Sequence, residues 1–330
     1  MRPRGFFPAG KRQPFPAPAG LAQSRPGWYH RERYRKEGTG GEAVPSSPAP
    51  GSVRTGARRV PRRRTAEGRL DMYQIEVDPH THSVVSLHAY STVEECARHA
   101  AERGLRGIAV TDHCSHTLSQ RANSIEAISN QKVLPDEMYG VRVWKGVEID
   151  IVDFDGTLAF ERTPDQFRPE LTGAQVLLPS RSVVIASVHT PFDRDTGTVE
   201  QNTRMYCRVL ENPYVTILGH TGRSGHPYEL RPVLETAKRL HKMVEINNAS
   251  LGSYGDRCAG TCLEIAKACR DLGVLITVSS DAHSSFQVGS FESAVRMLES
   301  IDFPQELIAN RTVESFEEAL KQARAGSGLS

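Results

Sequence analysis

Seven of the twelve histidines in this chain stand at or just beyond the ends of short apolar runs that have the composition of β-strands. One glutamate and one aspartate occupy equivalent places. The nine residues are His80, His82, His88, His113, Glu148, His189, His220, Asp281 and His283. Imidazoles and carboxylates are ligands of zinc, iron and manganese, and one tetrahedral zinc takes about four of them. Nine such groups in one pocket predict a cluster of two or three cations.

Each of these motifs, taken alone, has an ordinary structural explanation. His80 and His82 are two residues apart, so an extended strand turns both rings to one face, but such a pair could also be hydrogen-bonded at a surface. Asp112 beside His113 could cap a turn, and Glu148 could belong to an internal ion pair. The occurrence of all these motifs in one chain favours a metal site, because imidazoles and carboxylates packed together without cations would each carry a desolvation cost of several kcal/mol.

The segments between the motifs must form the elements that bring them together. Short β-branched runs predict seven strands, and segments with helical spacing lie between most of them. The predicted strands are 73–77, 107–111, 141–148, 183–189, 215–219, 243–247 and 274–279, and the predicted helices include 92–103, 199–210, 229–241, 258–272, 292–301 and 313–325. This alternation favours parallel strands joined by crossover helices and closed into a β/α barrel. Six of the seven strands then carry a candidate ligand at the carboxyl end, where such barrels place reactive groups.

Helix punctuation supports these assignments. Ser91 and Thr92 precede Val93-Glu94-Glu95, which is typical of an N-cap followed by acidic residues in the first turn. Gly104 and Gly273 follow the last residues of two predicted helices and are expected to end them.

The first 71 residues differ in composition from the rest of the chain. They hold 16 basic and 5 acidic residues, a net charge of +11, and ten of the twenty prolines, whereas residues 72–330 hold 25 basic and 34 acidic residues, a net charge of -9. The segment has no sustained apolar period, so we predict a disordered basic tail. It could be an arm for nucleic acid or a membrane surface, or a transit segment. The simpler interpretation is a solvated tail, or a start site placed upstream of Met72.

The lengths of the apolar stretches and the placement of the cysteines predict a soluble protein of a reducing cytoplasm. No apolar stretch reaches the ~18 residues that a membrane helix requires. The six cysteines form no CxxC pair and stand mostly in helical patterns, where a free cysteine behaves as a small hydrophobic residue.

The motifs also resemble those of a known family. In chain order they are HTH, SLHAYST, TDH, GVEI, a single histidine, GH, EINN and SDAH, followed by DFPQELIANRT. This series is similar to that of the PHP (polymerase and histidinol phosphatase) family, and within it to the YcdX-type phosphatase branch. The resemblance runs from about Met72 to about Ala325.

The resemblance implies a distorted seven-stranded (β/α)7 barrel, the PHP fold, with a trinuclear metal site, usually zinc, although manganese, iron or magnesium occurs in relatives. One metal would be held by His80, His82, Glu148 and Asp281, a second by His88, His113 and His283, and a third by Glu148, His189 and His220. All nine positions carry the expected residue type. A homotrimer is expected by analogy with the branch.

The chemistry expected of such a site is phosphate-ester hydrolysis. Neighbouring divalent cations lower the pKa of a bridging water and neutralise phosphoryl oxygens, so that hydroxide attacks phosphorus. Glu148 would bridge the cations, Asp112 would orient a ligand histidine, and Arg223 would clamp an oxyanion. Asp112 could instead only cap a turn, and Arg223 could be an ordinary loop residue. His116, Arg194 and Asn248 are further candidates for the pocket rim, although turns favour such residues in any case.

We therefore predict a phosphomonoesterase that acts on a small phosphorylated molecule. The alternative is a PHP-type nuclease or phosphodiesterase acting on nucleotides or on the 5′ ends of nucleic acids. The acidic core disfavours a polyanionic partner, which the basic tail could offset. A third, non-enzymatic possibility is metal storage or a structural role. Structural zinc sites are closed, so the open coordination positions expected of a three-metal site disfavour it.

Overall fold

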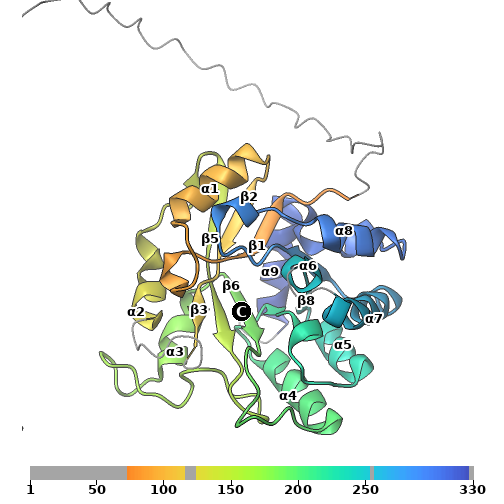
Figure 1. Cartoon of the computed structure of the whole chain (residues 1–330). Coiled ribbons are helices and arrows are strands. Elements are labelled where there is room, and N and C mark those ends of the chain that lie inside the picture. The colour runs from red at the N-terminus through yellow and green to blue at the C-terminus, as the bar shows by residue number, and fades with distance from the viewer. Residues whose placement is uncertain (1–72, 116–123, 253–255, 327–330) are drawn as a thin grey trace, which may run out of the picture. The chain divides into compact units, whose positions relative to one another are not determined.

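Seven strands form one parallel sheet in the order in which they occur along the chain (Figure 1). The computed structural model describes residues 73–115, 124–252 and 256–326. The strands are β1 (Val77–Thr81), β2 (Gly107–Val110), β5 (Val141–Asp150), β6 (Val183–Ser187), β7 (Ile217–Leu218), β8 (Met243–Asn247) and β9 (Ile276–Ser279). Two short strands that the sequence did not predict, β3 (His113–Cys114) and β4 (Glu137–Met138), pair with β5. The tail predicted for residues 1–71 lies outside the described residues.

The first and last strands meet and close the sheet into a barrel. Thr81 forms a parallel bridge with Ala282, and the amide of His82 donates to the Ala282 carbonyl at 2.8 Å. Farther down the seam, Nδ2 of the buried Asn310 donates to the carbonyls of Val77 and Val278, at 2.7 Å each. The predicted distorted seven-stranded β/α barrel is confirmed.

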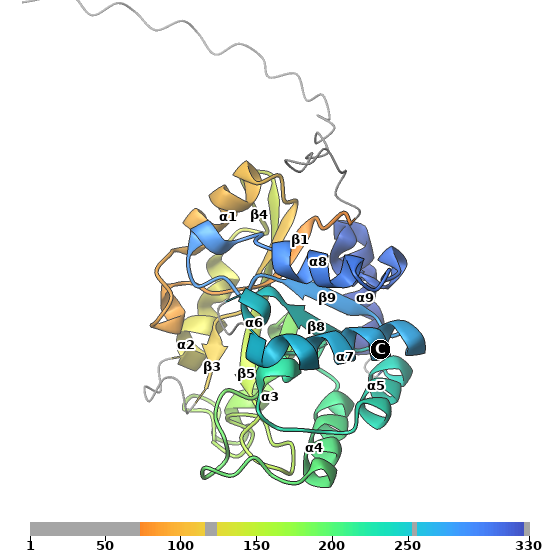
Figure 2. The same ribbon diagram turned by 45° about the vertical axis from the view of Figure 1, so that its right-hand side comes forward.

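Helices cover the outside of the sheet (Figure 1, Figure 2). They are α1 (Val93–Glu102), α2 (Ser124–Ser129), α3 (Gly173–Leu177), α4 (Val199–Glu211), α5 (Leu230–Arg239), α6 (Asn248–Gly252), α7 (Asp256–Leu272), α8 (Glu292–Glu299) and α9 (Val313–Ala325). Short 3-10 helices are η1 (Val84–Ser86), η2 (Asn130–Val133), η3 (Leu178–Ser180), η4 (Thr221–Arg223), η5 (Ser285–Gln287), η6 (Gln305–Leu307) and η7 (Ala309–Arg311). Within the described ranges, no helix is long and apolar enough to cross a bilayer.

Local sequence sets the ends of these elements. Thr92 and Glu95 form a capping box at the start of α1, in which each side chain accepts a hydrogen bond from the other residue's amide. Gly104 and Gly273, with φ of 78° and 66°, end α1 and α7 in the left-handed conformation that glycine adopts readily. The predicted first strand, 73–77, was wrong at both ends. The ladder begins only where Val77 pairs with Gly107, and the strand then continues to Thr81.

Alternation along the strands divides the apolar core into two layers. One set of strand residues packs against the outer helices. The other set faces the barrel interior and meets α9 there; it consists of Val77, Ala109, Trp144, Val183, Ile185, Ile217 and Met243, with Ala309, Phe316, Ala319 and Leu320. Val77, Val183, Ile217 and Met243 are the first residues of their strands, so α9 closes the amino-terminal end of the barrel. The carboxyl ends of the strands are left for polar groups.

Candidate metal centre

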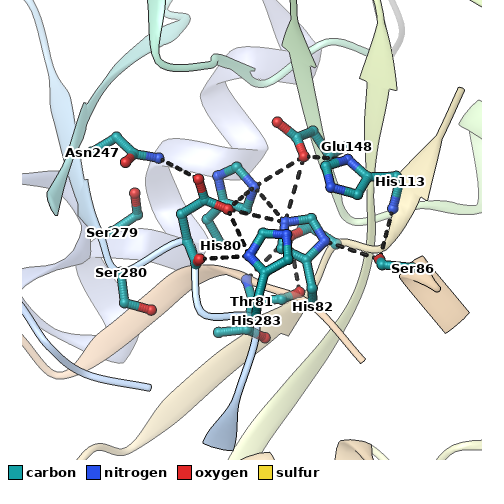
Figure 3. Close-up of polar contacts among 12 residues, drawn as sticks. His80, Thr81, His82, Ser86, His113, Glu148, Asn247, Ser279, Ser280 and His283 are labelled. Carbon is teal, nitrogen blue, oxygen red and sulfur yellow. Dashed lines mark hydrogen bonds and ion pairs between the residues drawn. The ribbon is translucent and has the colours of Figure 1, made fainter. Parts of the chain in front are cut away.

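Glu148 lies at the centre of the carboxyl-terminal end of the barrel, with its side chain fully buried. Its Oε2 atom is 2.8 Å from Nδ1 of His113 and 3.3 Å from Nε2 of His80. Its Oε1 atom is 2.8 Å from Nε2 of His220 and 3.2 Å from Nε2 of His189. One carboxylate therefore contacts histidines from four separate segments. Figure 3 shows its contacts with His80 and His113.

The other predicted ligands adjoin this carboxylate. Nε2 of His82 lies 3.1 Å from Oδ1 of Asp281 and 3.5 Å from Oε2 of Glu148. Nε2 of His283 lies 2.9 Å from Nε2 of His88, and the rings of His82 and His283 have centroids 4.3 Å apart. All nine predicted residues thus gather at one end of the barrel.

The ligand atoms fall into three overlapping groups. In each group the atoms lie within 4.8 Å of one another: His82 with His113 and His283, His80 with His82 and Asp281, and His113 with Glu148 and His189. The resemblance implied three similar sets but assigned His82 and His113 to one metal each. In the structure both rings stand between two groups.

Several ligand atoms are buried and have no hydrogen-bond partner among the described residues. They are Nδ1 and Nε2 of His113, Oε2 of Glu148, Nε2 of His189 and Nδ1 of His220. Buried polar atoms are normally paired, because an unpaired one costs about 1–3 kcal/mol. Cations among these atoms would satisfy them, so the residues present fit a cluster of divalent metal ions.

Two acidic residues hold the rings of clustered histidines in place. Oε1 of Glu245 accepts from Nδ1 of His80 at 2.6 Å, and Oδ1 of Asp150 accepts from Nδ1 of His189 at 2.7 Å. A carboxylate only accepts, so each ring carries a proton on Nδ1 and turns Nε2 toward Glu148. This is the arrangement that metal-ligating histidines require.

Asp112 acts on His82 through a serine. Ser86 Oγ donates to Oδ1 of Asp112 at 2.6 Å and lies 3.0 Å from Nδ1 of His82, so His82 Nδ1–H donates to the serine. Asp112 also accepts from the amide and hydroxyl of Ser83, at 2.7 and 2.8 Å. The carboxylate of Asp112 thus accepts hydrogen bonds from both serines, and the orienting role predicted for it stays a prediction.

Sequence reasoning did not single out Glu245, Asp150 or Asp78 as site residues. Glu245 stands within the EINNAS segment and Asp150 two residues after Glu148, so strand alternation could have indicated that Asp150 faces the same side as Glu148. Asp78 is fully buried and accepts from the amides of Ser280 and Gly289 at 3.1 and 2.8 Å. It joins β1 to the segment after β9, and burial raises its pKa to about 6.

The predicted rim residues lie in different settings. Nη2 of Arg223 donates to Oδ2 of Asp281 at 2.7 Å, and its side chain is 12% exposed. Asn248 accepts from the amides of Ser293 and Ala294 at 2.9 and 3.0 Å, so it caps the start of α8. Arg194 is exposed in a loop, and His116 lies outside the described residues.

The charges of the cluster shift its proton equilibria in opposite directions. Burial disfavours the charged form of His189, but the charge of Glu148 and the hydrogen bond of Asp150 outweigh it and raise the pKa of His189 to about 10. Burial and the neighbouring His113 lower the pKa of His82 well below its usual range. Burial opposes ionisation of Glu148, yet the histidine charges around it hold its pKa well below the ordinary value. Positive charge is therefore strongly favoured beside Glu148.

Two of the ligand-type residues have backbone conformations that are uncommon outside glycine. His220 has φ 24° and Asp281 has φ 55°. Each stands two residues beyond the end of its strand and turns its side chain into the cluster. Such conformations cost about 1–3 kcal/mol and persist at functional sites, where the surrounding contacts fix them. Arg223 and Asn247 supply those contacts for Asp281, at 2.7 and 3.2 Å.

Comparison with known proteins agrees with this geometry. The PHP domain family matches residues 78–249, just over half of the 330 residues. The chain belongs to the PHP domain family. The match includes seven of the nine clustered residues, and the region after it supplies Asp281 and His283.

Curated relatives of this PHP domain protein match most of its length. A probable phosphatase of Caldanaerobacter subterraneus is 36% identical over 262 residues, which is 79% of this chain and 97% of that protein. A probable phosphatase of Clostridium novyi is 38% identical over 234 residues, 71% of this chain and 89% of that protein. Among solved structures, a histidinol phosphate phosphatase from Lactococcus lactis, complexed with zinc, L-histidinol and phosphate, covers 69% of this chain and 94% of its own at 18% identity, with a TM-score of 0.46.

Proposed function

We propose that this protein is a metal-dependent phosphomonoesterase that acts on a small phosphorylated molecule. One observation carries the proposal: nine imidazole and carboxylate side chains from separate segments meet around Glu148, and several of their buried ligand atoms lack other partners among the described residues. The relatives named as probable phosphatases support the reaction class.

In this proposal the nine residues hold three divalent cations, most simply zinc because imidazole predominates among the donors. When bound, such ions would lower the pKa of a water and neutralise phosphoryl oxygens. The protein's own part is to hold the ligand atoms in place. Glu245, Asp150 and the Ser86–Asp112 pair keep the protons of three histidines on Nδ1, outside the cluster.

Arg223 is the proposed contact for a phosphoryl oxygen. Its guanidinium is bonded to Asp281 by Nη2 and lies within 3.2 Å of Asn247 Oδ1 through Nη1. Burial opposes its charge, but the charge of Asp281 outweighs this effect and raises the pKa of Arg223. A permanently charged and well-oriented guanidinium next to the cluster suits an oxyanion.

The substrate class is tested by comparing esters. The purified full chain should release phosphate from p-nitrophenyl phosphate and leave bis-p-nitrophenyl phosphate and oligonucleotides intact. Comparable cleavage of the diester would favour the nuclease or phosphodiesterase instead. Dialysis against a chelator should abolish activity, and elemental analysis of protein purified without added metal should find bound divalent ions. Protein that contains no such ions and accepts none would contradict the proposal.

Three further properties are proposed from the resemblance and the composition alone. They are a homotrimeric assembly, a cytoplasmic location, and a catalytic domain that comprises residues 72–330. Light scattering on the purified chain tests the first, and comparison of the full chain with residues 72–330 in the monoester assay tests the third.

A further inference from the structure

A second polar site lies at the opposite end of the barrel from Glu148. A cavity of about 340 Å³ opens between α9, the start of β5 and the segment before β6. Arg142 stands six residues before Glu148 on the same strand, which corresponds to about 20 Å. The cavity is therefore separate from the metal centre.

The lining of this cavity is strongly basic. Four of its residues are cationic, Arg142, Arg181, Lys321 and Arg324, and one, Glu317, is acidic. Glu317 is half-exposed, and its Oε1 lies 3.7 Å from Nε of Arg142. The remaining three cations have no carboxylate within 4.0 Å in the described part of the chain. A pocket with this balance attracts anions.

Arg181 is the most deeply buried cation of this lining. It is 3% exposed, and its Nη1 atom donates to the Ile128 carbonyl and to Gln131, at 2.7 and 2.8 Å. Its buried Nε atom has no hydrogen-bond partner within residues 73–115, 124–252 and 256–326. Arg181 therefore adds a buried positive charge to the lining of the cavity and has no carboxylate as a partner in the described part of the chain.

The neighbouring cations add to this positive charge. Nη2 of Arg324 donates to the carbonyl of Arg181, and burial lowers the pKa of both arginines. Behind them Lys242 is 1% exposed, and its Nζ donates to the carbonyls of Val215 and Ala323 at 2.7 Å. Buried charges normally have counter-ions, yet among the described residues these groups contact neutral partners: carbonyls, the Ser180 hydroxyl and the ring of Tyr214.

We propose that this cavity binds a small oxyanion with two or more negative charges, such as a phosphate ester or a polycarboxylate. The guanidinium groups of Arg142 and Arg324 carry N–H donors, which match phosphate and carboxylate oxygens, and Lys321 and Arg181 add positive charge to the lining. Residues 1–71, with a charge of +11, are not complementary to the cavity. The site stands apart from the proposed catalytic function and does not depend on it.

Trp144 gives a direct readout of the cavity. It lines the site, and the guanidinium carbon of Arg142 lies 5.9 Å from its ring centroid. The chain has two tryptophans, Trp28 and Trp144, so a full-length Trp28→Phe protein reports on Trp144 alone. Titration with inorganic phosphate and, separately, with citrate should give a saturable change in emission that sodium chloride at equal ionic strength does not give. Saturation by phosphate or by citrate identifies which oxyanion the site prefers, and saturation by neither overturns the proposal.

A pair of double variants locates the response. Arg142→Gln with Lys321→Gln should raise the dissociation constant at least about tenfold, because two charge-assisted contacts are lost. The matched control is Arg231→Gln with Lys267→Gln, which removes the same charge from exposed positions on α5 and α7. It should leave the constant unchanged. An equal effect of both pairs would show a general charge effect, and an unchanged response in the cavity variant would place the anion elsewhere; either result contradicts the proposal.

Discussion

Oε1 of Glu245 accepts a hydrogen bond from Nδ1 of His80 at 2.6 Å, and neither side chain is appreciably exposed. The same carboxylate accepts from Ser279 Oγ at 2.5 Å and, through Oε2, from the amide of His220 at 2.7 Å. Glu245 on β8 thereby orients one ligand-type ring and anchors the backbone of another. Burial opposes its ionisation, but the charge and the hydrogen bond of His80 lower its pKa.

Replacing Glu245 should weaken metal binding without removing a ligand. Glu245→Gln keeps the shape of the side chain but loses the charge that holds the proton on Nδ1 of His80. We expect the affinity for the metal held by His80 to fall about 10–100-fold, as for other residues that orient metal ligands. Competition against a chromophoric chelator measures it. The exposed Glu264→Gln on α7 is the control, and equal affinities in the two variants would contradict the orienting role.

His189→Ala should abolish turnover while the protein stays folded. His189 is held by Asp150 and faces Glu148 with Nε2, so the variant lacks a proposed ligand rather than part of the apolar core. We expect hydrolysis of p-nitrophenyl phosphate to fall at least about 100-fold. His99→Ala, on α1 and outside the cluster, is the matched control. Full activity of His189→Ala at several manganese concentrations would rule out the assigned role.

The barrel seam should depend on Asn310. Besides the two bonds donated by Nδ2, its Oδ1 accepts from the amide of Val278 at 3.0 Å. Asn310→Ala leaves three buried backbone groups without their partner, so we expect the free energy of unfolding to fall by about 2–4 kcal/mol. Urea denaturation followed by circular dichroism measures this loss. Gln322→Ala, exposed on α9, should change it by less than about 0.5 kcal/mol; a similarly small effect at Asn310 would show that the seam does not need this side chain.

The buried Lys242 should make stability depend on pH in the alkaline range. Burial, together with the charge of Arg324, lowers its pKa from 10.5 to about 8. Between these values the unfolded chain binds more protons at this residue than the folded chain, so the contribution to the free energy of unfolding rises with pH. Relative to Lys242→Met, wild type should therefore gain stability between pH 8 and pH 10.5. Denaturation of both proteins below pH 8 and near pH 10 tests this, and a constant difference would show an ordinary pKa.

Much of the architecture follows from local patterns. The helices α1, α4, α5, α7, α8 and α9 lie within two residues of their predicted limits at nearly every end, because apolar spacing and residues such as Thr92 and Gly104 act over a few neighbours. The first strand was misplaced because Tyr73 is buried for a reason other than strand pairing. It packs in the apolar core, and its hydroxyl donates to the Phe303 carbonyl at 2.7 Å, outside the ladder. A single run of residues does not reveal which partner it will bury against.

The sequence by itself determined which residues could bind metal and that a parallel barrel would bring them to one end, because residue type and strand direction are local properties. Only the tertiary structure decided that Glu148 lies within 3.5 Å of five histidines, that Glu245 and Asp150 stand behind two of them, and that Arg223 is bonded to Asp281. The basic cavity around Arg181 was likewise decided by the packing of α9 against β5 and β6. These relationships join residues up to about two hundred positions apart, and their geometry depends on how strands and helices pack around the barrel.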